Sequence, residues 1–152
     1  MTKEPFIGDR YEGEFRNNKK EGRGIYYWHN GNIYEGDFKN GKIEGRGIDY
    51  YNNGDWYEGD NKNGLKEGKG IYYYNNGDWY EGDWKNDKRE GKGIFYYNNG
   101  GREMGDYLNG FQIGIHVKLT QSGDITKSIF YSKKLLWNPN NKFSYIIQIR
   151  IF

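Results

Sequence analysis

The chain of 152 residues contains no cysteine, and this absence excludes disulfides, cysteine-ligated zinc and thiol catalysis. Its two histidines, His29 and His116, have no partner at a recurring spacing, so no catalytic triad or metal motif is indicated. No stretch approaches the roughly 18 apolar residues that a membrane-spanning helix needs. Residues 1–9 are charged and lack the apolar segment of a signal peptide. Together these absences favour an intracellular protein.

Aliphatic residues are scarce as well, since the hydrophobic fraction is 34% and the mean hydropathy is −1.14. Aromatic residues nevertheless reach 19%, which a disordered chain would not contain, and there are 24 glycines. The formal charge of +2 indicates no polyanionic partner. This composition predicts short strands, tight turns and a thin core of packed rings.

Three short motifs recur every 23 residues without insertion or deletion, which is the signature of a repeat architecture. A Tyr-Glu-Gly motif begins at Tyr11, Tyr34, Tyr57 and Tyr80. A Glu-Gly-x-Gly-Ile motif begins at Glu21, Glu44, Glu67 and Glu90. An Asn-Gly pair stands at Asn30, Asn53, Asn76 and Asn99.

Each unit predicts two short strands, near 33–38 and 45–51 in the second unit, joined by the polar loop 39–42. Asn-Gly between aromatic runs is a strong hairpin signal, and strands joined by short links are antiparallel. The predicted fold class is therefore all-β, an elongated single-sheet solenoid of antiparallel hairpins with no helix between residues 10 and 124. One hairpin is marginal alone, so stability is expected to come from stacking between neighbours.

The repeat array is expected to span residues 8–124, with four regular repeats over 10–101 and a degenerate fifth over 102–124. In the fifth unit Glu103 and Met104 replace Tyr-Glu, and His116 replaces a glycine. Residues 125–152 form a degenerate C-terminal segment. Alternating apolar residues over 143–152 predict a strand there, which either caps the open end of the array or pairs with a partner's sheet.

The order Tyr-Glu-Gly-Asp-Phe/Trp, Asn-Gly-Lys, Glu-Gly-Lys-Gly and Asn-Gly-Asp at this period resembles the MORN repeat (membrane occupation and recognition nexus) over residues 8 to about 124. The family often has histidine where this chain has Glu21, Glu44, Glu67 and Glu90, a departure expected to alter loop charge and not the hairpin pattern. The resemblance implies an adaptor in cytoskeletal, ciliary or membrane-junction assemblies. Aromatic-glycine hairpins also build secreted cell-wall and choline-binding modules, but those lack the Tyr-Glu-Gly core.

No enzyme activity, cofactor or metal is expected. Carboxylates two residues apart, such as Glu35 and Asp37, share a strand face and could pair for acid–base chemistry, but they recur in every repeat. Repetition favours a solvated or cross-strand-paired acidic face. Gly22-Arg23-Gly24 lacks the strand–loop–helix context of a phosphate loop, so these glycines are expected to make room for neighbouring rings.

Two surfaces are candidates for binding. An apolar ribbon suited to a peptide or helix is expected at Ile25, Ile48, Ile71, Ile94, Tyr27, Tyr50, Tyr73 and Tyr96. The competing interpretation is that the chain's own tail covers that face. A basic edge suited to anionic lipid is expected at Lys19, Lys20, Lys39, Lys42, Lys62, Lys66, Lys85, Lys88 and Arg89. Nucleic acid is not expected, because acidic strand residues lie close by.

These features predict a non-catalytic scaffold or adaptor that binds protein partners through the aromatic face, with a peripheral lipid-binding module as the alternative. The expected location is the cytoplasm, a cytoskeletal or ciliary assembly, or a membrane periphery, and the array ends may self-associate end to end. Lipid contact through a basic edge should weaken steeply with salt, whereas aromatic docking should hardly change.

The buried face depends on one turn. A two-residue Asn30-Gly31 turn would place Tyr27 opposite Tyr34, whereas a three-residue loop with Gly31 as the bulge residue would place Tyr26 opposite Tyr34. The bulged register is favoured because it sets glycines beside large rings. It predicts an exposed Tyr27 series and mostly buried side chains at Trp28, Tyr34, Tyr51, Tyr57, Tyr74 and Tyr80. It also predicts a polar notch where Asp49 and Asn61 replace rings on that face.

Overall fold

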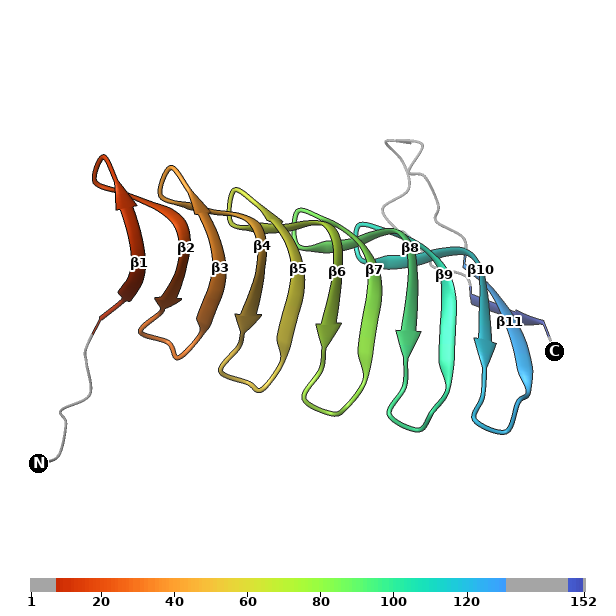
Figure 1. The fold of residues 1–152 in the computed structure, drawn as a ribbon. Helices are drawn as coiled ribbons and strands as arrows, with labels where there is room; N and C mark the ends of the chain where they lie inside the picture. Colours follow the sequence, from red (N-terminus) through yellow and green to blue (C-terminus); the bar gives the residue numbers. More distant parts are fainter. Residues whose placement is uncertain (1–7, 131–147, 152) are drawn as a thin grey trace, which may run out of the picture.

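A computed structural model describes the backbone of residues 8–130 and 148–151, and the side chains of residues 8–130. It forms one antiparallel sheet in which every strand pairs with the next strand in sequence (Figure 1). The strands are β1 Arg10–Arg16, β2 Lys19–Tyr27, β3 Ile33–Lys39, β4 Lys42–Tyr50, β5 Trp56–Lys62, β6 Leu65–Tyr73, β7 Trp79–Lys85, β8 Lys88–Tyr96, β9 Arg102–Leu108, β10 Phe111–Leu119, β11 Ile125–Phe130 and β12 Gln148–Ile151. The expected helix-free hairpin solenoid is confirmed over residues 10–124.

The turn between the two strands of a unit is tighter than the predicted four-residue loop. In the second unit Lys39 pairs with Lys42, and only Asn40 and Gly41 form the turn. Both have positive φ, 51° and 85°, as a type I′ turn requires. The second strand therefore begins at Lys42, three residues before the expected start.

The turn between units has the predicted bulged register. The backbone N–H of Gly31 donates to Trp28 O at 3.0 Å, and that of Trp28 donates to Asn32 O at 3.0 Å. Gly31 has a φ of 89°, which favours glycine. Tyr26 consequently pairs with Tyr34. This register puts the Tyr34, Tyr57 and Tyr80 rings on the buried face, where each has 0% exposure.

Paired glycines make room for these tyrosine rings. The ring of Tyr34 lies over Gly36 and Gly47, which face each other across β3 and β4. A Cβ at Gly47 would fall inside van der Waals contact with that ring. The Tyr34 hydroxyl donates to the backbone carbonyl of Asp37 at 3.1 Å. The glycine pairs are thus required by close approach of a ring, as the sequence predicted.

A bulge next to each glycine pair bends the sheet. Gly36 pairs with Gly47 but Phe38 pairs with Ile43, so β4 has extra residues around Gly45, whose φ is 80°. The Asp37 carboxylate accepts from the backbone N–H of Arg46 at 3.3 Å and holds the bulge. Because the bulge recurs in each unit, the strands curve together and the sheet becomes a trough rather than a flat ribbon (Figure 1).

Glutamates of the Glu-Gly-x-Gly motif join consecutive units. The Glu44 carboxylate accepts from the backbone N–H of Asn63, in the tip turn of the following unit, at 3.0 Å. The same bond forms in the other units, from Asn40 to Glu21, from Asn86 to Glu67 and from Asn109 to Glu90. The hairpin pairing is kept at these glutamates, as expected, and each one also hydrogen-bonds across a repeat boundary, which the sequence did not indicate.

The C-terminal strand is observed only in part. Gln148–Ile151 pairs antiparallel with β11 and so extends the sheet at its end. The remaining predicted strand residues, 143–147 and 152, lie outside the described part of the chain. At the four described residues the tail therefore continues the sheet and does not lie on either of its faces.

Candidate interaction surfaces

The predicted aromatic ribbon lies on the outer face of the sheet but is less exposed than expected. Tyr50 has 41% exposure, whereas Tyr27, Tyr73 and Tyr96 are half-buried. Rings of the adjacent strands cover them, because Trp56 stacks on Tyr73 at 3.7 Å and Trp79 stacks on Tyr96 at 4.5 Å between centroids. The guanidinium of Arg10 lies 4.1 Å from the centroid of Tyr27. Two of the four tyrosines of the ribbon thus stack on tryptophan, Tyr27 lies against a guanidinium, and Tyr50 is the most exposed.

The opposite series is mostly buried, as predicted, although to different degrees. Tyr34, Tyr57 and Tyr80 are fully buried, but Trp28, Tyr51 and Tyr74 are half-buried. A single sheet has no second layer above the latter rings, so each packs along the trough instead. Tyr74, for example, is tilted against Tyr72 at 4.8 Å. The trough itself therefore presents aromatic surface.

The isoleucines of the predicted ribbon alternate with exposed glutamates. Ile48 pairs with Glu35 on one side and with Glu58 on the other. Next to this row the structure places cross-strand ion pairs, such as Arg46 with Asp60 at 3.9 Å. The outer face therefore has three parallel rows, of stacked rings, of Ile and Glu, and of ion pairs. The row of glutamates beside the isoleucines follows from the register and was not part of the predicted site.

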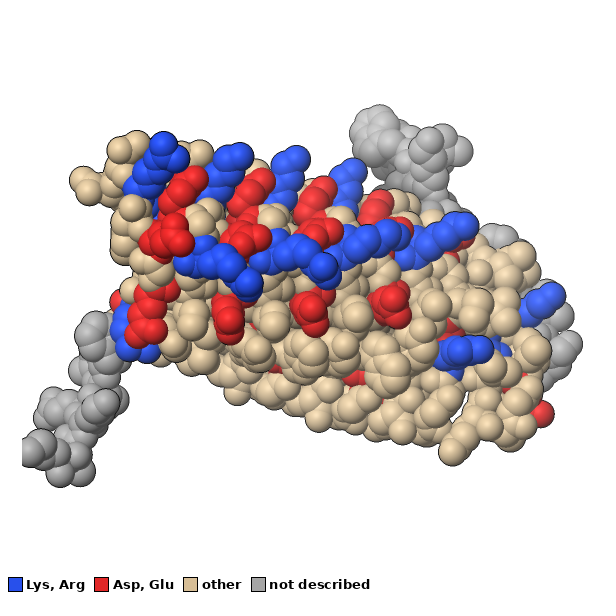
Figure 2. Space-filling view, in the orientation of Figure 1, with Lys and Arg blue, Asp and Glu red and all other residues tan. Residues whose placement is uncertain are grey.

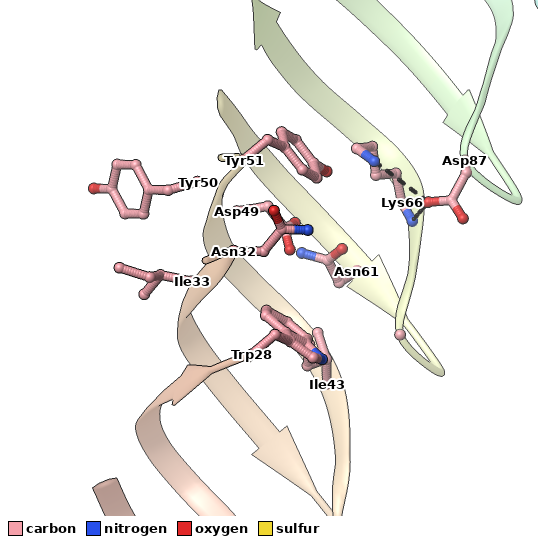
Figure 3. Close-up of a pocket in the computed structure, with 11 residues that line it drawn as sticks. Trp28, Asn32, Ile33, Ile43, Asp49, Tyr50, Tyr51, Asn61, Lys66 and Asp87 are labelled. Carbon is pink, nitrogen blue, oxygen red and sulfur yellow. Dashed lines mark hydrogen bonds and ion pairs between the residues drawn. The ribbon is translucent and has the colours of Figure 1, made fainter. Parts of the chain in front are cut away.

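A cavity of about 230 Å³ opens into the trough at the predicted polar notch. Figure 3 shows Asp49, Asn61 and Asn32 between the rings of Trp28 and Tyr51, while Tyr50 and Ile33 point away. In other units the position of Asp49 holds Tyr26, Tyr72 or Phe95, and that of Asn61 holds Phe38, Trp84 or Tyr107. Two rings are therefore replaced by short polar groups, and the space they would fill is open.

The polar groups of this notch have few partners within the protein. Asn61 has 6% exposure, and its Nδ2 has no hydrogen-bond partner. Burial raises the pKa of Asp49 to about 6, with Lys66 opposing and Asp87 adding to the rise. The Lys66 ammonium lies 3.5 Å from Asp87 and within 5.2 Å of the Tyr51 ring centroid. The notch thus holds one carboxylate whose charge is not matched by a cation of its own.

A family model for the MORN repeat matches four consecutive segments, residues 11–33, 34–56, 57–79 and 80–102. These segments cover more than half of the chain. The chain belongs to the MORN-repeat family. A search of curated proteins gave no match. MORN repeats are in general modules for interaction with proteins or membranes.

The predicted lipid-binding cations of the MORN array do not form one basic edge. Lys20, Lys66 and Arg89 point over core rings, with the Lys20 ammonium 4.0 Å from the Tyr26 centroid. The cations that are exposed at the tips are Lys19, Lys39, Lys42, Lys62, Lys85 and Lys88. Figure 2 shows basic rows with acidic rows beside them along the upper part of the array. The edge therefore has fewer free cations than the sequence predicts.

Within residues 8–130 no group of three His, Asp or Glu side chains is arranged to hold a metal ion. In the described part of this MORN protein no helix is long and apolar enough to cross a membrane.

Proposed function

We propose that this MORN protein is a non-catalytic scaffold that binds an elongated protein partner along the outer face of its sheet. The observation that carries the proposal is the row of tyrosines on the outer face, two of them stacked on tryptophan, beside the Ile and Glu row. An apolar row next to an acidic row suits a partner with one apolar stripe and adjacent basic residues. By the family resemblance, we place this scaffold inside the cell, in a cytoskeletal, ciliary or membrane-associated assembly.

The period of the face favours a helix as the partner element. Two strands at a spacing of about 4.8 Å repeat the surface roughly every 10 Å. Seven residues of an α-helix rise about 10.5 Å. A helix lying along the rows would therefore present one apolar residue to each tyrosine of the ribbon, and its basic residues would meet Glu35, Glu58 and Glu81. Such a contact gains affinity by repetition rather than from one deep pocket.

Tyr50→Asp tests this proposal, because Tyr50 is the most exposed ring of the ribbon. Purification from native lysate with this variant should lose the partners that the unmodified chain captures, and the loss should be seen at both low and high salt. Phe111→Asp is the matched control, because Phe111 has 65% exposure in another part of the array. Equal capture by the Tyr50 variant would refute the proposed face.

Anionic lipid is the second candidate, supported by the exposed lysines at the tips. Sedimentation with phosphatidylserine vesicles at increasing salt tests it separately. Lipid contact predicts binding that falls steeply with ionic strength and is lost when Lys39 and Lys62 are changed to Gln. Binding that persists in high salt would contradict it.

A further inference from the structure

We infer that the notch between Trp28 and Tyr51 is a binding site for an arginine side chain of a partner polypeptide. The notch lies on the trough face and does not depend on the docking surface proposed above, which is on the outer face. The notch is not a general feature of the repeat. It is present where Asp49 in the second unit and Asn61 in the third unit depart from the repeated pattern.

The shape of the notch favours a planar group. Asp49 and Asn61 stand where other units have rings, so the open volume of about 230 Å³ has replaced aromatic side chains. Trp28 and Tyr51 remain on either side of it (Figure 3). A guanidinium is planar and stacks on aromatic faces, whereas an ammonium is a compact and strongly hydrated point charge.

The charge of the notch favours a cation. Lys66 is the nearby base, but its ammonium is engaged by Asp87 at 3.5 Å and by the surrounding rings. The Asp49 carboxylate has no such partner, and its pKa of about 6 reflects the cost of keeping a half-buried charge. A guanidinium offers this carboxylate two parallel N–H donors and removes that cost.

The side chain of Asn61 is compatible with a bound guanidinium once its amide is turned. Its buried Nδ2 has no partner, and buried polar groups normally have one. Rotation of the amide by 180° exchanges Nδ2 and Oδ1 without moving other atoms, so Asn61 can turn an acceptor toward a bound guanidinium. Asn32 also lines the notch, but its Oδ1 already accepts from the backbone N–H of Asn52 at 3.0 Å. The site thus offers a carboxylate, the Asn61 amide and two aromatic walls.

The test uses the full chain and three small probes that differ in one group: N-acetyl-arginine methylamide, its lysine analogue and its citrulline analogue. Nuclear magnetic resonance follows the Trp28 indole N–H and the Asn61 side-chain amide during titration. The arginine probe should give saturable shifts with a dissociation constant on the order of millimolar, because a single ion pair in a site open to solvent is weak. The lysine probe should bind at least about threefold more weakly, and the neutral citrulline probe should give no saturation.

Asp49→Asn keeps the shape of the side chain and should weaken the arginine probe at least about tenfold, the loss expected for a charge-assisted bidentate pair. Asp106→Asn, at an exposed carboxylate away from both proposed surfaces, is the control and should leave binding unchanged. A backbone spectrum that is unchanged away from the notch shows that the Asp49 variant is folded. Arginine shifts that do not saturate, equal binding of lysine or citrulline, or full binding by the Asp49 variant would each overturn the assignment.

Discussion

The imidazole of His116 and the carboxylate of Glu103 lie 3.5 Å apart, in the positions that a glycine and a tyrosine occupy in each regular repeat. The buried His116 ring lies over Gly105, and its Nε2 is 2.9 Å from the carbonyl oxygen of Asp106. Tyr34 makes the equivalent contacts in the second unit, over Gly36 and to Asp37. The fifth unit therefore keeps the core ring but supplies it from the other strand of the hairpin.

The exchange between Glu103 and His116 predicts strong coupling between two substitutions. Glu103→Tyr alone should destabilise the chain by about 2–4 kcal/mol because a second ring would compete for the space over Gly105. His116→Gly alone should cost a similar amount because it removes a buried ring. The double variant restores the regular pattern and should come within about 1 kcal/mol of the unmodified chain. Urea unfolding measures this, and simple addition of the two losses would contradict the exchange.

The close contact between a tyrosine ring and a glycine pair predicts that substitutions at two glycines of neighbouring units differ in their cost to stability. Gly47→Ala should destabilise by about 3 kcal/mol or more, since its Cβ meets the Tyr34 ring and neither strand can move away. Gly64→Asn should cost less than about 1 kcal/mol, because nothing lies within 4 Å of a Cβ there and asparagine tolerates a φ of 83°. Thermal unfolding of both variants distinguishes steric contact from loss of backbone freedom. Similar losses would mean that the ring does not require the glycine.

The hydrogen bond from the Asn63 N–H to the Glu44 carboxylate predicts a loss of coupling between repeats. Glu44→Ala should destabilise by about 0.5–2 kcal/mol, because the turn N–H loses its carboxylate acceptor. Amide hydrogen exchange should rise mainly at the tip turn of the following unit. Glu35→Ala removes an exposed glutamate of the outer face and should change stability by less than about 0.5 kcal/mol. Equal losses of stability in the two variants would show that Glu44 stabilises the chain through its charge and not through this hydrogen bond.

Asp49 predicts a pH dependence with a definite sign. Its pKa is about 6 in the folded chain against 3.8 as the ordinary value, mainly because of burial. The carboxyl group of Asp49 binds its proton more tightly in the folded state than in the unfolded state. The contribution of this proton to the free energy of unfolding is therefore fully present below pH 4 and is lost as the pH rises through 6. Asp49→Asn should therefore be more stable than the unmodified chain by up to about 3 kcal/mol above pH 7, and about equal to it below pH 4.

The measurement is the difference between the two unfolding curves from pH 4 to pH 8, since a difference cancels groups that titrate in both chains. Glu35→Gln should give a flat difference over the same range. A flat difference for Asp49→Asn would mean that the notch does not hold a destabilised carboxylate.

The period, the hairpins and the register could be predicted because each depends on a few neighbouring residues. Asn-Gly pairs specify turns through their tolerance of positive φ, and Gly31 in the bulge position determines which residues oppose Tyr34. Once that register is known, alternation assigns every strand residue to a face. The notch at Asp49 and Asn61 followed from the same alternation, because both residues interrupt the rows of rings.

Local patterns by themselves determined this fold and the faces of its sheet, whereas the tertiary structure decided which side chains meet across units. The exposure of Tyr27, Tyr73 and Tyr96 depends on rings or cations that adjacent strands contribute. The exposure of Lys66 depends on rings from three different strands and on Asp87 in a turn. The contact of Glu44 with Asn63 likewise spans a repeat boundary. Hydrogen-bonded pairing follows from residues near in sequence, but contacts between stacked hairpins depend on how the bulges curve the sheet, and that curvature is the combined result of all the units.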